Sequence, residues 1–306
     1  MRIARAGVLA LACLGIGGSP AEGPARSPQE AKTLVAIREA GRALVPLHER
    51  KRPARAGDWL ARFPEAGQTF DEYLGSSPNR PGQGWTTLYV QPLGPSDEGQ
   101  RRLLEATVDL LGRFYGLPVK TLEPIGLEAL PPKARRLHPT YGNPQIHSLA
   151  VLDLLKPRRP ADALAVLCLT ASDLYPQDDW NFVFGQASLG ERVGVWSTSR
   201  LGDPSKEFAT CLRRTLAVAL HETGHMFGIV HCTAYECGMN GSNSLAVSDR
   251  APMPFCPECE MKVWWNVGLD PVARYRSLAD FAEARGLAAE GRAWRASLEA
   301  LEARGR

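Results

Sequence analysis

The segment from residue 221 to residue 231 constrains this chain more than any other part of it. It reads His-Glu-Thr-Gly-His-Met-Phe-Gly-Ile-Val-His, and a run with helical apolar spacing leads into it. His221 and His225 are four residues apart, so a helix places both imidazoles on one face, about one turn from each other. Gly228 can adopt a positive φ angle that ends the helix and reverses the chain. His231 then follows closely enough to supply a third nitrogen to one metal ion.

Three histidine nitrogens leave one position of a tetrahedral zinc ion open, as in a catalytic site and unlike a closed structural one. Glu222 directly follows the first histidine and is the natural general base for a water molecule at that open position. A His-Glu-x-x-His string alone also occurs in helices that bind no metal. The longer string, which adds Gly228 and His231, is the one found in metzincin peptidases and favours a zinc-dependent hydrolase.

Four of the seven cysteines are clustered just after the last histidine of this motif. They are Cys232, Cys237, Cys256 and Cys259. Two neighbouring pairs of cysteines are a common tetrahedral zinc framework, so we predict a second, structural zinc that holds the loop beneath the first. Two disulfides are the alternative, since an exported protein would form them. Cys168 and Cys211 lie in apolar surroundings and are expected to be buried thiols.

The N-terminal residues have the three parts of an export signal. Arg2 and Arg5 are positive, residues 8–17 form an apolar stretch too short to span a bilayer, and small residues suited to cleavage follow. We therefore expect residues 1–21 to be a signal peptide and the protein to be periplasmic or extracellular. Cys13 offers a weaker match to a lipid-anchor site. The alternative is the apolar N-terminus of a cytoplasmic protein.

Composition argues against two classes of protein. The formal net charge is +3 without a dense basic run, so the chain lacks the electrostatic pattern of a nucleic-acid-binding protein. Beyond the N-terminal segment no apolar run approaches the ~20 residues of a membrane-spanning helix. No feature of the sequence indicates an oligomeric state.

Helix and strand signals alternate from residue 85 onward, which favours an α/β fold of stacked layers. Strands are expected at residues 86–91, 119–125, 163–170, 182–187 and 192–197, and helices at residues 96–115 and 146–155. Ser96 is the expected N-cap of the first of these helices, and Ser205 that of the helix that carries the histidines. Residues 131–144 are expected to be a connection, and amphipathic helices to follow Trp264 and Trp265.

The chain before residue 85 is expected to form a partly helical N-terminal extension, residues 22–84. Helical spacing covers residues 32–50, and short helices broken at Pro64 follow. Residues 85–306 are then expected to form one domain that includes the C-terminal helices.

Residues 221–259 resemble the archaemetzincins, a metzincin family with the pattern His-Glu-x-x-His-x-x-Gly-x-x-His-Cys-x4-Cys-x-Met and a distal Cys-x-x-Cys. The resemblance to this family extends to residues 88–94, 173–176, 180–185 and 192–195. Residues 57–60 with Phe63 and Pro64 are similar to the N-terminal extension of its longer members. The resemblance thus covers residues 57 to 270.

The resemblance implies a mixed, twisted sheet packed on helices, with an active-site helix and a C-terminal helical subdomain. It implies a zinc metallopeptidase with two zinc ions per chain, in which Glu222 is the general base and then the proton donor to the leaving amine. The catalytic zinc would be held by His221, His225 and His231, and the structural zinc by Cys232, Cys237, Cys256 and Cys259. Met239 would form the Met-turn, an apolar floor beneath the catalytic zinc.

The implied substrate is a peptide or protein that lies along an edge strand of the sheet, for which residues 181–188 are the best candidate. Asp178 and Asp179 lie near this strand and would influence substrate preference, although exposed acids are more often only solvated. Residues 22–84 are a candidate regulatory segment over the cleft.

Two other functions are compatible with the sequence. One is a non-catalytic zinc protein that recognises peptides on the same fold, and the intact Glu222 argues against it. The other is an exported, disulfide-bonded hydrolase of non-peptide amides.

Overall fold

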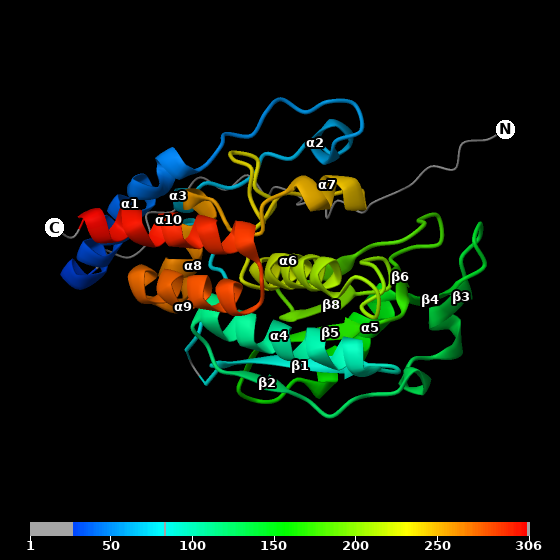
Figure 1. Ribbon diagram of the computed structural model, residues 1–306. Helices are drawn as coiled ribbons and strands as arrows, with labels where there is room; N and C mark the ends of the chain where they lie inside the picture. Colours follow the sequence, from blue (N-terminus) through cyan, green and yellow to red (C-terminus); the bar gives the residue numbers. More distant parts are fainter. Residues whose placement is uncertain (1–26, 83, 305–306) are drawn as a thin grey trace.

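The computed structural model describes residues 27–82 and 84–304 (Figure 1). The expected signal peptide at residues 1–21 and Cys13 lie outside the described residues. Within the described ranges, no helix is both long enough and apolar enough to cross a bilayer.

A five-stranded mixed sheet forms the centre of the molecule, with the strand order β2-β1-β5-β8-β7. The neighbouring pairs are parallel except β7 with β8, which are antiparallel. All eight residues of β5 are buried, as a continuous apolar run in a parallel sheet requires. The strands are β1 (Thr87–Leu93), β2 (Val119–Thr121), β5 (Ala163–Thr170), β7 (Gly185–Ala187) and β8 (Val193–Ser197).

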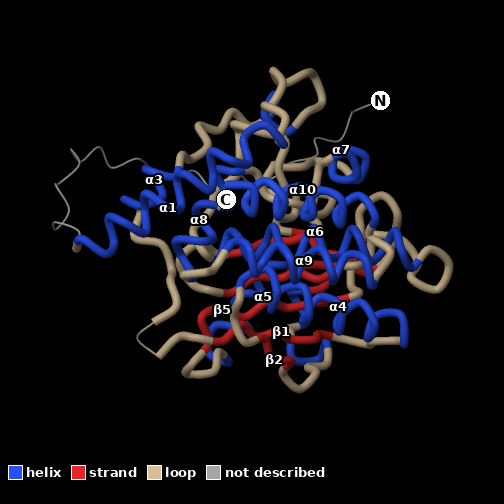
Figure 2. The backbone as a smooth tube through the Cα atoms, turned by 60° about the vertical axis from the view of Figure 1, so that its left-hand side comes forward, coloured by secondary structure: helices blue, strands red, loops and turns tan. Residues whose placement is uncertain are grey.

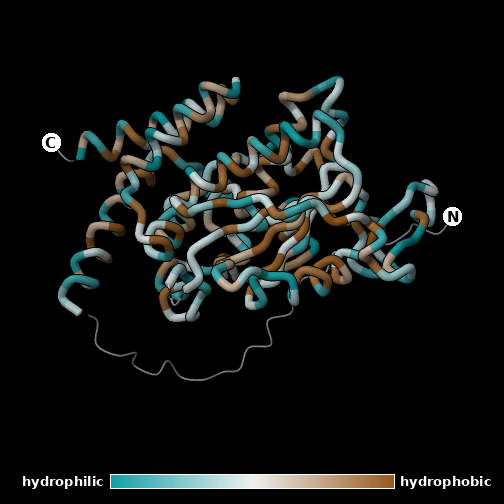
Figure 3. The backbone as a smooth tube through the Cα atoms, turned by 90° about the horizontal axis from the view of Figure 1, so that it is seen from below, coloured by the Kyte–Doolittle hydropathy of each residue, from teal (hydrophilic) through white to brown (hydrophobic). Residues whose placement is uncertain are grey.

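Helices cover both faces of this sheet, and Figure 1 shows α6 lying over β8. Alternate residues of β1 divide between two cores: Leu88 and Val90 pack on the side of α4 and α6, and Tyr89 on the side of α5. Hydrophobic segments accordingly gather in the middle of the molecule, where the sheet lies (Figure 3). The helices of these two layers are α4 (Glu98–Tyr115), α5 (Ser148–Leu155) and α6 (Phe208–Met226).

A second, three-stranded sheet has the order β3-β4-β6. Its strands are β3 (Arg135–Leu137), β4 (Pro144–His147) and β6 (Asp173–Tyr175). The expected connection at residues 131–144 therefore contains a strand, and the helix expected from residue 146 begins at Ser148. Strands of three or four residues are too short to show a periodicity in the sequence.

Both expected serine caps are wrong. Asp97 caps α4, and its side chain accepts a hydrogen bond of 2.7 Å from the amide of Gln100. Helix α6 begins after Glu207 without a side-chain cap, while the hydroxyl of Ser205 donates to Asp203. In each case several good capping residues lie within one turn, and the backbone conformation determines which of them is at the cap position.

The N-terminal and C-terminal helices lie together beside the sheet, where α1 packs against α8 and α10 (Figures 1 and 2). The helix expected at residues 32–50 starts earlier, at a capping box on Ser27, and ends at Leu44. Trp264 and Trp265 lie inside α8 and not before it. These helices are α1 (Pro28–Leu44), α2 (Trp59–Arg62), α3 (Phe70–Gly75), α7 (Leu245–Arg250), α8 (Pro257–Val267), α9 (Pro271–Ala284) and α10 (Ala288–Arg304), with short 3-10 turns η1 (Val45–Leu47), η2 (Leu127–Ala129), η3 (Pro132–Ala134) and η4 (Lys156–Arg158).

Candidate metal centre and active site

The histidines of the motif converge at the C-terminal end of α6. The Nε2 atoms of His221 and His225 are 3.0 Å apart. Helix α6 ends at Met226, and Gly228 takes a φ angle of 77°, a backbone conformation that glycine adopts without strain. This turn returns His231 to the pair, so that one nitrogen from each of the three rings lies within 4.8 Å of the others.

The hydrogen bonds of the two helical histidines determine which ring nitrogen carries the proton. Nδ1 of His221 lies 2.9 Å from the carbonyl oxygen of Gly238, and Nδ1 of His225 lies 2.7 Å from that of Ile229. A carbonyl oxygen only accepts, so each Nδ1 donates and each Nε2 presents a lone pair. Two lone pairs that face each other need a cation between them. Three imidazole nitrogens are a common donor set of catalytic zinc, so these residues fit that ion.

Burial keeps both helical histidines neutral. Desolvation, reinforced by the neighbouring His231, lowers the pKa of His221 to about 4. Desolvation is the main cause that lowers the pKa of His225 well below its usual value, and the charges of the two neighbouring histidines add to it. Because the neutral imidazole is the form that binds a metal, burial leaves both rings able to bind one at neutral pH.

Glu222 is buried between α6 and the last strand of the sheet. A Cβ atom placed on Gly185 of β7 would come within 2.5 Å of Oε1 of Glu222, so the carboxylate lies directly on the strand backbone. Burial raises the pKa of Glu222 to about 8. A carboxyl group with a pKa near neutrality can both take and return a proton, as general acid–base catalysis requires.

Met239 is fully buried beneath α6 and packs against Gly224, between the two helical histidines. Phe255 lies beside the same glycine. The methionine is therefore an apolar side chain packed against the backbone of the helix that carries His221 and His225.

The four clustered cysteines are all buried, and their sulfur atoms lie within 4.8 Å of one another. The sulfurs of Cys232 and Cys256 are 3.6 Å apart. Sulfurs bound to one tetrahedral zinc at ~2.3 Å would be about 3.8 Å apart, whereas a disulfide requires ~2.05 Å. The backbone amides of Met239 and Cys256 also donate to the sulfur of Cys237, which stabilises a thiolate. These contacts fit a closed zinc site better than two disulfides.

Asn240 organises the loop that joins the two metal-ligand groups. Its side-chain oxygen accepts from the amide of Cys237 at 3.0 Å, and its amide nitrogen donates to the carbonyls of Cys232 and Tyr235. Since Cys232 directly follows His231, order in the cysteine loop also holds the third histidine. Sequence reasoning missed Asn240, although its place beside Met239 and inside the cysteine loop was an available signal.

Part of the N-terminal extension lies against the same loop. Both carboxylate oxygens of Glu65 are 3.0 Å from Nδ1 of His231, and the ring of Trp59 meets that histidine edge-on at 5.1 Å. Asn79 donates from its amide to the carbonyl of Met226 at 2.9 Å. Sequence reasoning assigned none of these three residues to the site, although Trp59 lies in a stretch that carries the family resemblance. Nothing local in the sequence links Glu65 to a histidine 166 positions away.

The strand expected at residues 182–187 is shorter than predicted. Only Gly185–Ala187 pair with β8, while Val183 forms an isolated bridge to Leu174. Among the described strands none pairs with the outer edge of β7, which ends the sheet. Asp178 and Asp179 are exposed.

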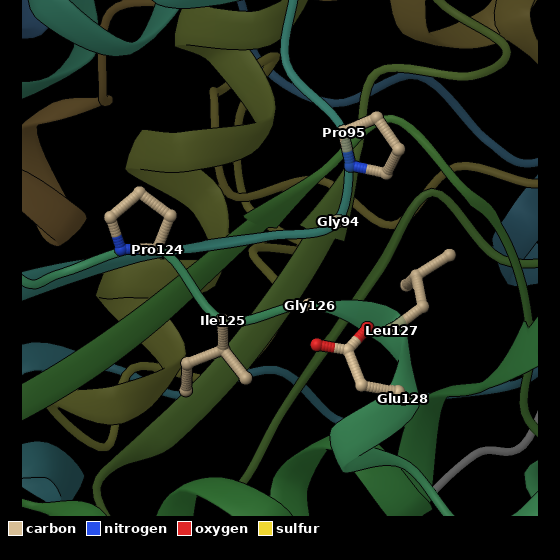
Figure 4. Close-up of a pocket in the computed structure, with 7 residues that line it drawn as sticks. All are labelled: Gly94, Pro95, Pro124, Ile125, Gly126, Leu127 and Glu128. Carbon is tan, nitrogen blue, oxygen red and sulfur yellow. The ribbon is translucent and has the colours of Figure 1, made fainter.

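A separate pocket of 370 Å³ opens just beyond the end of β1 (Figure 4). It is lined by Gly94, Pro95, Pro124, Ile125, Gly126, Leu127 and Glu128. No histidine or cysteine lines it, so it contributes nothing to the metal centre.

Comparison with known proteins points to one family. The model of peptidase family M54 matches residues 151–264. Archaemetzincin-2 of Pongo abelii is 35% identical over 258 residues, which cover 72% of this chain and 71% of that protein. Archaemetzincin-1 of Homo sapiens is 30% identical over 74% of this chain and 52% of its own length. The crystal structure of archaemetzincin from Methanopyrus kandleri superposes with a TM-score of 0.50 and 31% identity, covering 61% of this chain and 97% of that one.

Proposed function

Because this chain belongs to the archaemetzincins and is a zinc metallopeptidase, we propose that Glu222 is its general base and that His221, His225 and His231 hold its catalytic zinc. The observation that carries this proposal is the convergence of three histidine nitrogens within 4.8 Å at the end of α6, with the buried Glu222 next in the chain to the first of them.

Bound zinc would polarise the scissile carbonyl and lower the pKa of the attacking water to about 7. The carboxylate of Glu222 takes a proton from that water while the water oxygen forms a bond to the carbonyl carbon. When the carbon–nitrogen bond breaks, the same carboxyl group returns the proton to the leaving amine. Burial alone raises the pKa of Glu222, and a zinc ion on the neighbouring histidines would lower it and so favour the carboxylate form that the first step needs.

The substrate class is a peptide or protein, and we propose that it lies along the outer edge of β7. A peptide in extended form would add its main-chain hydrogen bonds to the unpaired side of that strand. Glu222 supports this placement, because its carboxylate lies on the backbone of Gly185 within β7. Exposure of Asp178 and Asp179 favours solvation over a direct contact with the substrate.

A second zinc per chain belongs to the same proposal, as a structural ion held by Cys232, Cys237, Cys256 and Cys259. The sulfur separation of 3.6 Å and the amide hydrogen bonds to Cys237 support this choice over disulfides. A metal bound by all four thiolates would stabilise the loop that carries His231.

Export of the protein and the division at residue 84 also remain proposals. The charged and apolar residues 1–17 motivate the first. Mass measurement of the protein purified from its native source would show a shortened N-terminus if a signal peptide is removed. A full-length chain would contradict export through a cleaved signal.

The decisive experiment replaces Glu222 with glutamine, which keeps the size of the side chain and removes its basicity. Wild-type protein should cleave members of a peptide library and carry two zinc ions. The Glu222→Gln variant should bind the same amount of zinc and lose turnover by about 10²–10⁴-fold. Equal cleavage by the variant would refute the assigned mechanism. Absence of cleavage by the wild type would instead favour a zinc protein that only recognises peptides.

A further inference from the structure

The three zinc-ligating histidines differ in what holds their outer nitrogen. His221 and His225 donate from Nδ1 to the backbone carbonyls of Gly238 and Ile229. His231 donates to the carboxylate of Glu65, whose two oxygens are both 3.0 Å from Nδ1. The third ligand is thus oriented by a charged side chain from the N-terminal extension and by no backbone group of its own segment.

His231 lacks the support that a helix gives to the side chains of the other two histidines. The other two ligands lie on α6, where the helix limits the directions of their side chains. His231 follows the turn at Gly228 and belongs to no helix or strand. Its ring is contacted edge-on by Trp59 and hydrogen-bonded to Glu65.

The segment that carries Glu65 is itself anchored at both ends. We call residues 57–70 the strap. At its start, the amide of Asn243 donates to the carbonyl of Gly57 at 2.7 Å. At its end, the amide of Phe70 donates to the carboxylate of Glu258 at 2.8 Å. Glu258 directly precedes Cys259. Between them, Thr233 donates to the carbonyl of Ala66. The strap is therefore tied to the chain that follows His231, at Thr233 and Asn243, and to the first turn of α8 at Glu258.

We propose that Glu65 is a positioning residue of the catalytic zinc, acting through His231, so that the N-terminal extension completes the metal centre. This inference rests on the proposed function. The carboxylate keeps the proton on Nδ1, aims Nε2 at the metal and makes that nitrogen a stronger donor. Glu65 lies on the outer nitrogen, so it supports a ligand and is not a fourth ligand itself.

The test measures zinc affinity, which reports on the metal centre without relying on catalysis. Wild type, Glu65→Ala, Glu65→Gln and Gln68→Ala proteins are titrated with a zinc chelator of known affinity. Gln68 is the matched control, because it also joins the strap to the histidine loop, through the carbonyl of Gly228, and touches no ligand. Cobalt substitution separates the two sites, since only the cysteine site gives thiolate-to-metal charge-transfer absorption.

Glu65→Ala should raise the dissociation constant of the histidine site by about 10–100-fold and alter its cobalt d–d bands. Glu65→Gln still accepts a hydrogen bond but lacks the charge, so its dissociation constant should lie between those of Glu65→Ala and the wild type. The zinc affinity of the histidine site should be unchanged in Gln68→Ala. The zinc affinity of the cysteine site should be unchanged in every variant. Wild-type affinity in a folded Glu65 variant, or an equal loss in Gln68→Ala, would overturn the inference. The isosteric Glu65→Gln carries the test if the alanine variant does not fold.

The proposed function is tested separately in the same series. Peptide cleavage by the wild type and its loss in Glu222→Gln would stand even if Glu65 proved irrelevant to zinc binding. Failure of the wild type to cleave peptides would leave the effect of Glu65 on zinc affinity intact.

Discussion

The sulfur of Met239 lies directly against Gly224, with no room for a side chain between them. A Cβ atom on Gly224 would be 2.6 Å from Sδ of Met239 and 3.1 Å from its Cε. Gly224 lies between Glu222 and His225 on α6, so the side chain of Met239 reaches the backbone of the helix that carries the histidines. The second of the two unspecified positions in the His-Glu-x-x-His string is therefore constrained in this chain by packing.

Gly224→Ala should destabilise the protein although alanine is the better helix former. Helix propensity favours alanine by roughly 1 kcal/mol, while overpacking against Met239 costs about 1–3 kcal/mol. We expect a net loss of about 1 kcal/mol in the free energy of unfolding, measured by denaturant titration. The penalty should shrink when Met239→Ala is combined with it, as a double-mutant cycle detects.

Gly112→Ala is the matched control for this prediction. Gly112 lies inside α4, and a Cβ there would meet its nearest neighbours at 3.7 Å, an ordinary contact. That substitution should leave stability unchanged or improve it. A similar loss in both variants would contradict the role of Met239.

Gly185→Ala should reduce turnover by displacing Glu222. Gly185 does not have a positive φ angle, so alanine suits the backbone and the effect is steric, through the 2.5 Å approach to Oε1. A shift of about 1 Å in a catalytic group can lower kcat by ~10²-fold. Kinetics should show that loss while zinc content stays constant.

Gly190→Ala provides the comparison, because a Cβ at that position in the turn before β8 has no neighbour within 4 Å. Its kcat should equal that of the wild type. An unimpaired Gly185→Ala enzyme would show that Glu222 is not held against β7 during catalysis.

The proposed structural zinc predicts that replacing Cys256 and Cys259 together by serine removes one zinc ion from each chain, because serine is a poor zinc ligand. The thermal midpoint should fall, since metal binding contributes to folding. Zinc per chain is measured by elemental analysis and the midpoint by calorimetry. Replacing the buried Cys211 by alanine should leave zinc content unchanged. One zinc per wild-type chain, with no free thiols among the four clustered cysteines, would favour disulfides.

Glu260→Gln should destabilise the protein by about 3–5 kcal/mol, because it leaves a buried charge without its partner. The carboxylate of Glu260 in α8 lies 2.8 Å from the guanidinium of Arg274 in α9, and both side chains are at most 1% exposed. Glu302→Gln removes the surface pair with Arg276 and should cost at most about 1 kcal/mol. Equal effects in the two variants, measured by denaturant unfolding, would contradict the importance of burial.

The sequence by itself determined the features that depend on local spacing. His221 and His225 face the same way because four residues make about one helical turn, and Gly228 reverses the chain because it tolerates a positive φ angle. The continuous apolar run at residues 163–170 became β5 with its predicted ends. Cys168 and Cys211 are buried, as their apolar surroundings indicated.

Only the tertiary structure decided the features that join distant segments. The bond from His231 to Glu65, the contact of Glu222 with Gly185 and the approach of Met239 to Gly224 each need elements that pack together in space. The choice of Asp97 over Ser96 as a cap and the three-residue strands β3 and β6 likewise depend on the path of the backbone. Covalent geometry sets the spacing of side chains within a helix turn, whereas a contact across 166 residues exists only after the core has fixed both segments.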